Sequence, residues 1–172
     1  MELRYKGRED LTSSVSLLIS ILIRYPEVAK INYDPESHNL KFTFIYAGVL
    51  AENESHDLSR NIISSIEVYN SLESKVPRQV KINFSESDNL TMIEIQRDVD
   101  TLVQEEIALI VDLLRQNISK CLVTEDNDSL IDEDLVIQEE LIEHMLESIK
   151  AQSENKRLYA FRDEGRVLVF NK

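Results

Sequence analysis

Hydrophobic and polar positions follow the same pattern twice along the first half of the chain. Residues 10–24 carry apolar side chains at helical spacing, and residues 28–48 alternate apolar and polar side chains on either side of a turn. Residues 55–74 return to helical spacing, and residues 79–96 alternate again. A period of 3.6 residues is typical of a helix and a period of two is typical of a strand. The pattern therefore predicts a helix and a β-hairpin, followed by a second helix and a second hairpin.

The two predicted hairpins also share sequence. One contains KINYDPESHNL, which begins at Lys30, and the other contains KINFSESDNL, which begins at Lys81. Asn, Ser and Asp are common in the turns of hairpins, so these shared residues indicate turns. After the second turn Met92 and Ile93 break the alternation, and this predicts a β-bulge near Met92.

Two such units are expected to share one sheet. A single hairpin with one helix buries too little apolar area to be stable. Two hairpins laid edge to edge give a four-stranded sheet with helices on one face. An approximate twofold axis would then relate the two helix–hairpin units.

A third helix and an acidic segment follow the duplicated part. Residues 100–122 carry the most apolar helical stripe of the chain, and Thr101-x-x-Gln104 fits a capping box at its start. Residues 123–140 hold eight acids and no base. Like charges at this density repel one another, so the first part of this segment is expected to be a hinge.

The predicted fold class is therefore α+β. Duplicated helix–β-hairpin units form an antiparallel sheet with helices packed on one face, and a C-terminal helix (residues 134–153) and a third hairpin (residues 157–171) follow. Residues 1–122 are expected to form the duplicated core and residues 123–133 the acidic hinge. Residues 134–172 are expected to form a helix–hairpin element that packs on the core or on a partner chain.

Charge and composition narrow the classes of partner. The formal net charge is −13, from 32 acidic and 19 basic residues, and such a surface repels nucleic acids and anionic membranes. The longest apolar run, Leu17 to Ile23, is too short to span a bilayer. Cys121 is the single cysteine, which excludes an intramolecular disulfide and fits a reducing compartment. The first ten residues lack the apolar core of a signal peptide, so the expected location is cytoplasmic.

One set of residues is a candidate for a metal-binding site. The three glycines are isolated, which excludes a P-loop, a dinucleotide-binding turn and a GxSxG elbow. Glu140, His144 and Glu147 fall on one face of a predicted helix, where they could hold a divalent metal ion. The alternative is a charged surface stripe. No cofactor is expected.

The last hairpin is apolar on both faces. A strand with one face in water alternates apolar and polar residues, whereas a strand without this alternation is covered twice. A second copy of the chain would supply the missing cover, most simply in a twofold dimer. The predicted interface residues are Leu158, Tyr159, Phe161, Val167, Leu168, Val169 and Phe170.

Three hypotheses for function follow. The leading one is a non-enzymatic cytoplasmic interaction or regulatory module that acts as a homo-oligomer. The second is a small-molecule binding domain with a pocket between the duplicated halves, lined by Tyr33, Phe42, Phe84 and Met92. The third is an enzyme that uses carboxylates or a metal at His144.

Overall fold

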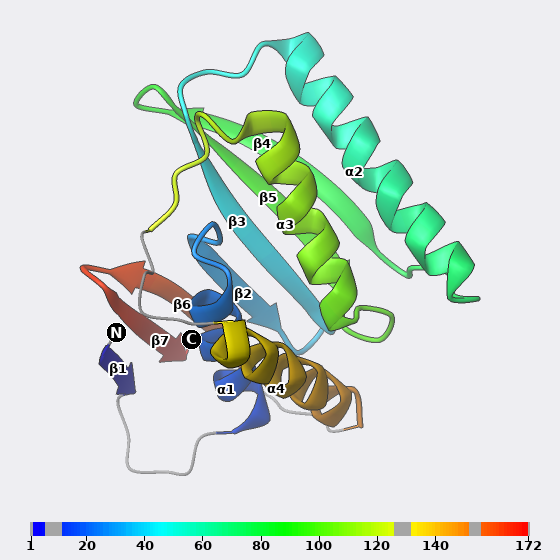
Figure 1. Ribbon diagram of the computed structural model, residues 1–172, viewed down its shortest axis with the longest axis vertical. Coiled ribbons are helices and arrows are strands. Elements are labelled where there is room, and N and C mark those ends of the chain that lie inside the picture. The colour runs from blue at the N-terminus through cyan, green and yellow to red at the C-terminus, as the bar shows by residue number, and fades with distance from the viewer. Residues whose placement is uncertain (1, 6–11, 126–131, 152–155, 172) are drawn as a thin grey trace.

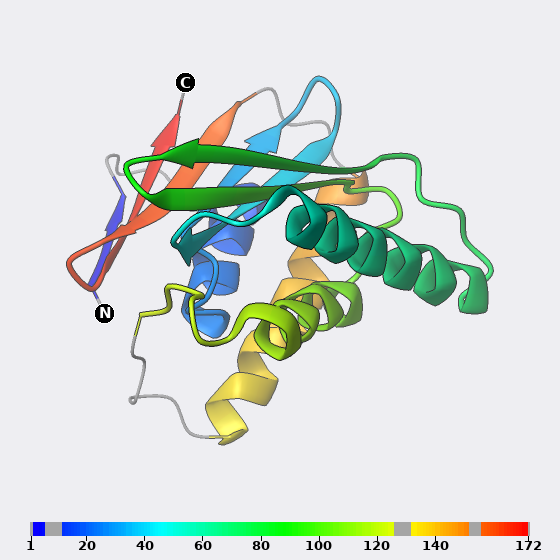
Figure 2. The same cartoon turned by 90° about the horizontal axis from the view of Figure 1, so that it is seen from above.

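The computed structural model describes residues 2–5, 12–125, 132–151 and 156–171. These residues form seven strands in a single sheet and four helices. All four helices lie on the same face of the sheet, as the two perpendicular views show (Figure 1, Figure 2). The predicted α+β fold class is therefore confirmed. No helix of the described residues has the length and apolar character needed to cross a membrane.

The bounds of the elements agree with the predicted helices and hairpins to within a few residues. The four helices are α1 Ser13–Arg24, α2 Glu52–Leu72, α3 Gln104–Ile118 and α4 Asp132–Ala151. The seven strands are β1 Glu2–Tyr5, β2 Lys30–Asp34, β3 Asn39–Ala47, β4 Val80–Ser87, β5 Leu90–Asp98, β6 Leu158–Asp163 and β7 Arg166–Asn171. Strand β1 was not predicted, because four residues are too few to show an alternation. Of the predicted hinge, residues 126–131 lie outside the described residues.

The duplicated hairpins occupy the middle and one end of the sheet. The strand order is β1-β7-β6-β2-β3-β5-β4, and β3 pairs with β5 antiparallel. An approximate twofold axis between β3 and β5 would generate this order from two hairpins. The third hairpin joins at β2, with Ala160 opposite Ile31. Only β1, which pairs with β7, runs parallel to its neighbour in the described sheet.

Strand pairing is continuous through Met92, so the predicted bulge is wrong. Met92 pairs with Ile45 on one side and with Ser85 on the other, and the register does not change along either ladder. The two hairpins differ instead in their turns. Strand β4 turns into β5 through Asp88 and Asn89, both with positive φ, whereas β2 and β3 are joined by residues 35–38. Because the turns differ in length, β5 pairs with β4 in a different register from that of β3 with β2. This difference in register points Met92 away from the helices without a bulge.

The C-terminal helix and hairpin pack within their own chain. Helix α4 lies against α1 (Figure 2), and its apolar stripe of Ile142, Leu146 and Ile149 is buried. Strand β6 pairs with β2, so the hairpin extends the sheet under α1. Of the two alternatives for this element, the helix and one face of the hairpin take the first and pack on the core of their own chain.

A buried ion pair joins the sheet to the helical layer. Arg97 points from β5 toward the helices, and both Arg97 and Glu106 of α3 have side chains with 0% exposure. The Arg97 guanidinium donates two hydrogen bonds to the Glu106 carboxylate, at 2.6 and 2.7 Å. Asn70 of α2 donates a third to the same carboxylate at 2.7 Å. One carboxylate therefore holds β5, α2 and α3 together.

The loop between β5 and α3 is held by Asp98. Its carboxylate accepts hydrogen bonds from the Arg97 guanidinium, the Thr101 hydroxyl and the Gln79 backbone N–H. Burial by itself raises the pKa of Asp98, but the hydrogen bonds from Thr101 and Gln79, with the charge of Arg97, bring that pKa below its ordinary value. The predicted capping box is wrong, because Thr101 bonds Asp98 and the residue before α3, Val103, gives no side-chain cap.

We expect Glu106→Gln to destabilise the fold by about 3–5 kcal/mol, because removing one partner leaves the buried Arg97 charge uncompensated. Chemical denaturation monitored by circular dichroism measures the free energy of unfolding. The control is Glu67→Gln, an exposed carboxylate of α2, which should change stability by less than about 0.5 kcal/mol. Equal effects of the two substitutions would contradict a central role for the ion pair.

We also expect the contribution of Asp98 to be lost in acid. A carboxyl whose folded-state pKa is depressed stabilises the fold above its unfolded-state pKa of about 3.9, and this stabilisation disappears as the pH falls toward the folded-state pKa. The difference in unfolding free energy between wild type and Asp98→Asn should therefore be constant from neutral pH to about pH 5 and shrink below about pH 4. Asp132→Asn, at an exposed position, is the control. A difference that stays constant into strong acid would contradict the expectation.

Candidate protein-interaction surface

The sheet face opposite the helices is not covered by any described element (Figure 2). We call it the open face. It contains a groove of about 550 Å³ that runs across β7, β6, β2, β3 and β5. The lining residues are Ala29, Lys30, Thr43, Ile45, Met92, Tyr159, Phe161 and Phe170. Most of these side chains are apolar, which is unusual for a sheet face left in water.

Strand geometry explains how the aromatic side chains reach the open face. Successive side chains of a strand point to opposite faces, and in β6 Leu158 and Ala160 are buried while Tyr159 and Phe161 lie on the other side. The rings of Phe161 and Phe170 stack with centroids 5.5 Å apart and planes 14° apart. Phe170 is nevertheless 45% exposed. An aromatic pair therefore stands at the edge of the groove in contact with solvent.

The groove carries little charge. Lys30 is the one charged side chain among its described lining residues, and its ammonium lies 5.3 Å from the centroid of the Tyr159 ring. Beside the groove, Lys41 and Glu94 neutralise each other in an ion pair of 2.9 Å. The groove therefore lacks the excess of negative charge that gives the whole chain its net charge of −13.

The predicted interface residues divide between the two faces of the hairpin. Leu158, Val167 and Val169 are buried in the core of their own chain, so an interface role for these three is wrong. Their side chains point toward α1, which covers this part of the sheet. The remaining four lie on the open face: Tyr159, Phe161, Leu168 and Phe170.

The predicted ligand-binding residues do not line one pocket. Tyr33 and Phe42 are buried in the core under the helices, and Phe84 packs at the edge of the same core. Met92 lies on the open face, in the groove. The shift of register in the second hairpin separates Met92 from the other three, so the predicted pocket between the duplicated halves is not formed by this set.

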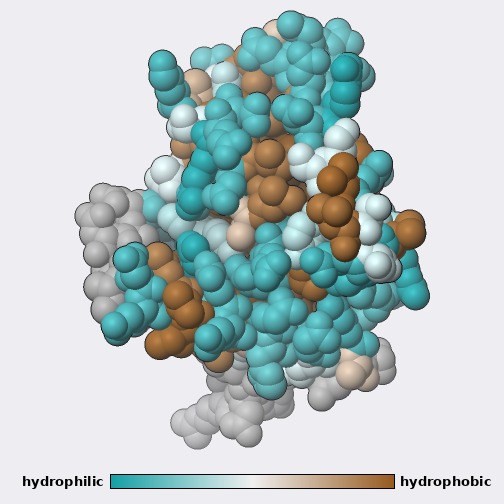
Figure 3. Space-filling view, turned by 45° about the vertical axis from the view of Figure 1, so that its right-hand side comes forward, coloured by the Kyte–Doolittle hydropathy of each residue, from teal (hydrophilic) through white to brown (hydrophobic). Residues whose placement is uncertain are grey.

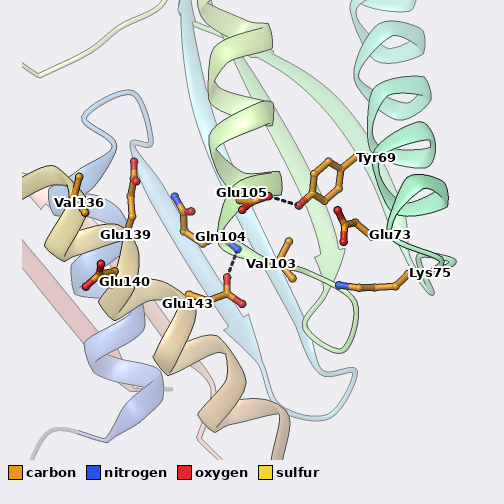
Figure 4. A pocket seen from close by; sticks show the side chains of 10 residues that line it. All are labelled: Tyr69, Glu73, Lys75, Val103, Gln104, Glu105, Val136, Glu139, Glu140 and Glu143. Atoms are coloured by element: carbon orange, nitrogen blue, oxygen red, sulfur yellow. Dashed lines mark hydrogen bonds between the residues drawn. The ribbon is translucent and has the colours of Figure 1, made fainter.

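A second hollow of about 380 Å³ lies where α3 begins, between α2 and α4 (Figure 4). It is lined by five glutamates: Glu73, Glu105, Glu139, Glu140 and Glu143. The Glu143 carboxylate accepts a hydrogen bond from the Gln104 backbone N–H at 2.8 Å, and Glu105 accepts one from the Tyr69 hydroxyl at 3.0 Å. These two carboxylates therefore serve the packing of α4 and α2 around the start of α3.

The hydrogen bonds of Gln104 and Tyr25 were not predicted. The Gln104 side-chain amide donates to the Tyr25 hydroxyl at 2.6 Å, and burial raises the pKa of Tyr25 to about 12. No local pattern indicates this contact, because the two residues are far apart in the chain. The burial of Arg97 is indicated by the sequence, since Arg97 follows Ile93 and Ile95 at an inward-facing position of a strand.

The three metal-site candidates, Glu140, His144 and Glu147, do not converge on one point. His144 and Glu147 are exposed on α4, and Glu147 pairs with Lys150 at 2.9 Å. Glu140 lies at the hollow beside α3. In the part of the chain that the structure describes, no three His, Cys, Asp or Glu side chains converge as metal ligands would.

A smaller apolar patch lies on the helical side. Figure 3 shows apolar side chains gathered in the middle of this side, with hydrophilic surface around them. A shallow hollow between α2 and α3 is lined in part by Val68, Leu72 and Leu109, and Leu72 is 79% exposed. We call Val68, Leu72 and Val76 the α2 patch; all three are exposed.

Comparisons with protein-family models, with curated proteins and with solved structures gave no match. No relative therefore supplies a function for this chain. The open face is the part of the described structure where apolar side chains, a groove and little charge coincide.

We expect zinc and manganese to leave the melting temperature unchanged, because the Glu140, His144 and Glu147 side chains do not converge. Differential scanning fluorimetry with and without each metal measures the melting temperature, and EDTA-treated protein gives the baseline. A reproducible stabilisation that His144→Ala abolishes would show that a metal binds at this helix.

Proposed function

We propose that the chain is a non-enzymatic interaction or regulatory module that acts as a homo-oligomer. The observation that carries the proposal is the uncovered aromatic side of the third hairpin. Tyr159, Phe161, Leu168 and Phe170 face solvent on a strand pair whose other side is already buried. Exposed apolar patches rimmed by polar residues mark interaction sites in proteins.

Burial of this surface would supply the free energy of association. Each Leu or Phe side chain that becomes fully buried contributes on the order of 1.5–3 kcal/mol. Phe170 has much of this area still exposed, and its ring already stacks on Phe161 in the free chain. Side chains that are already ordered lose less entropy on binding, which favours their role as anchors.

A cytoplasmic location completes the proposal. The single thiol, Cys121, is only partly accessible and forms no disulfide within the chain, which suits a reducing compartment. The regulatory role would then be exerted through protein contacts, by assembly of copies of the chain.

We expect the full-length protein to sediment as a homo-oligomer, most simply a dimer, at micromolar concentration. Phe170→Ser should raise the dissociation constant about tenfold or more, because it removes an apolar anchor whose burial is worth more than about 1.4 kcal/mol. Analytical ultracentrifugation over a range of concentrations measures the oligomeric state and the dissociation constant.

The matched control is Val136→Ser, which removes an exposed apolar side chain of α4 on the helical side. It should leave the dissociation constant unchanged. Circular dichroism establishes that each variant is folded. A wild-type chain that is a monomer at micromolar concentration would overturn the proposed function.

A further inference from the structure

The open face offers both a hollow and the side chains to fill one. The floor of the groove includes Ala29, Thr43 and Ile45, and Thr43 is buried even though it belongs to this face. Phe170 and Met92 stand at the rim with 45% and 39% exposure. A twofold contact brings the same patch of two copies together, so one patch must provide both projections and depressions. The open face meets this requirement.

The distribution of charge favours the same face. Helix α4 carries seven acids and one lysine, and α2 carries four acids and one arginine. Two copies that met through their helices would bring these acids together, and such like-charge contacts oppose association. Contact through the open face would place the acidic helices on the outside of both copies, far from each other.

The α2 patch is less suited to contact between copies. Glu67 precedes Val68, Glu73 follows Leu72, and both glutamates are exposed. Glu105 of α3 lies beside Tyr69 and is also exposed. A twofold contact through this patch would therefore bring acids from two copies close to one another, whereas none of the described residues that line the groove on the open face is a carboxylate.

We propose that two copies of the chain pack their open faces against each other about a twofold axis, with the groove of each copy receiving rim side chains of the other. The inference rests on the proposed function, because it names the partner and the surface of that same assembly. The result is a sandwich of two sheets with the helices outside, and face-to-face packing of sheets is a common way to bury their apolar sides. Nucleic acids and anionic membranes do not suit this surface, since the chain as a whole repels them.

Oxidation of methionine tests the surface in the unmodified protein. Met92 lies in the groove, and Met145 is 8% exposed in the core and serves as the internal reference. Hydrogen peroxide oxidises accessible methionine faster than buried methionine. Mass spectrometry of peptides should show Met92 oxidised at least fivefold more slowly at concentrations where the dimer forms than at concentrations where it dissociates, with Met145 unchanged.

A pair of charge substitutions tests the same surface. Met92→Glu on the open face should raise the dissociation constant at least tenfold, and Leu72→Glu in the α2 patch should leave it unchanged. Both positions are exposed in the free chain, so both variants should fold, and circular dichroism checks that they do.

The outcomes separate this inference from the proposed function. A dimer that Leu72→Glu dissociates and Met92→Glu does not, with Met92 equally reactive at all concentrations, overturns the open-face contact and leaves the homo-oligomer intact. A wild-type chain that is monomeric at micromolar concentration overturns both. Concentration-dependent protection of Met92 together with sensitivity to Met92→Glu supports the inference.

Discussion

The ion pair between Arg97 and Glu106 joins α3 to the sheet, and hydrogen bonds link α3 and its buried carboxylate to the other three helices. Asn70 of α2 donates to the same carboxylate. At the start of α3, Gln104 donates through its side chain to Tyr25, at the end of α1, and through its backbone N–H to Glu143 of α4. A connected set of hydrogen bonds thus runs from β5 to each helix. Removal of one buried charge would leave its partner without compensation in a medium that solvates charge poorly.

This network leaves the two faces of the sheet with different characters. The covered face combines apolar packing with a few fully satisfied charges around Arg97. The open face has aromatic and aliphatic side chains and no described element above them. Exposure of apolar side chains to water is unfavourable, and the rest of the fold offsets this cost. Burial of the open face against a partner would therefore lower the free energy.

The distribution of charge favours one relative orientation of two copies. Most of the acidic excess lies on the helices, as α4 illustrates with seven acids. Among the described residues that line the groove on the open face, Lys30 alone is charged. Long-range repulsion between acidic copies slows every approach, but it weakens with distance and with salt. The orientation that keeps the helices apart is therefore the least opposed, and it is the one that brings the two apolar faces together.

The sequence by itself determined the order and type of the elements. Apolar spacing located the four helices and the three hairpins, because the periods of helix and strand are set by local backbone geometry. The alternation in β6 and β7 also separated Tyr159 and Phe161 from Leu158, so the aromatic side of the open face could be predicted. Tertiary structure decided the rest. The register that turns Met92 away from Tyr33 depends on strand pairing, the partner of Arg97 lies on another element, and the cover of the third hairpin by α1 joins segments more than a hundred residues apart. Contacts between distant segments depend on how whole elements pack, and no local pattern in one sequence records that packing.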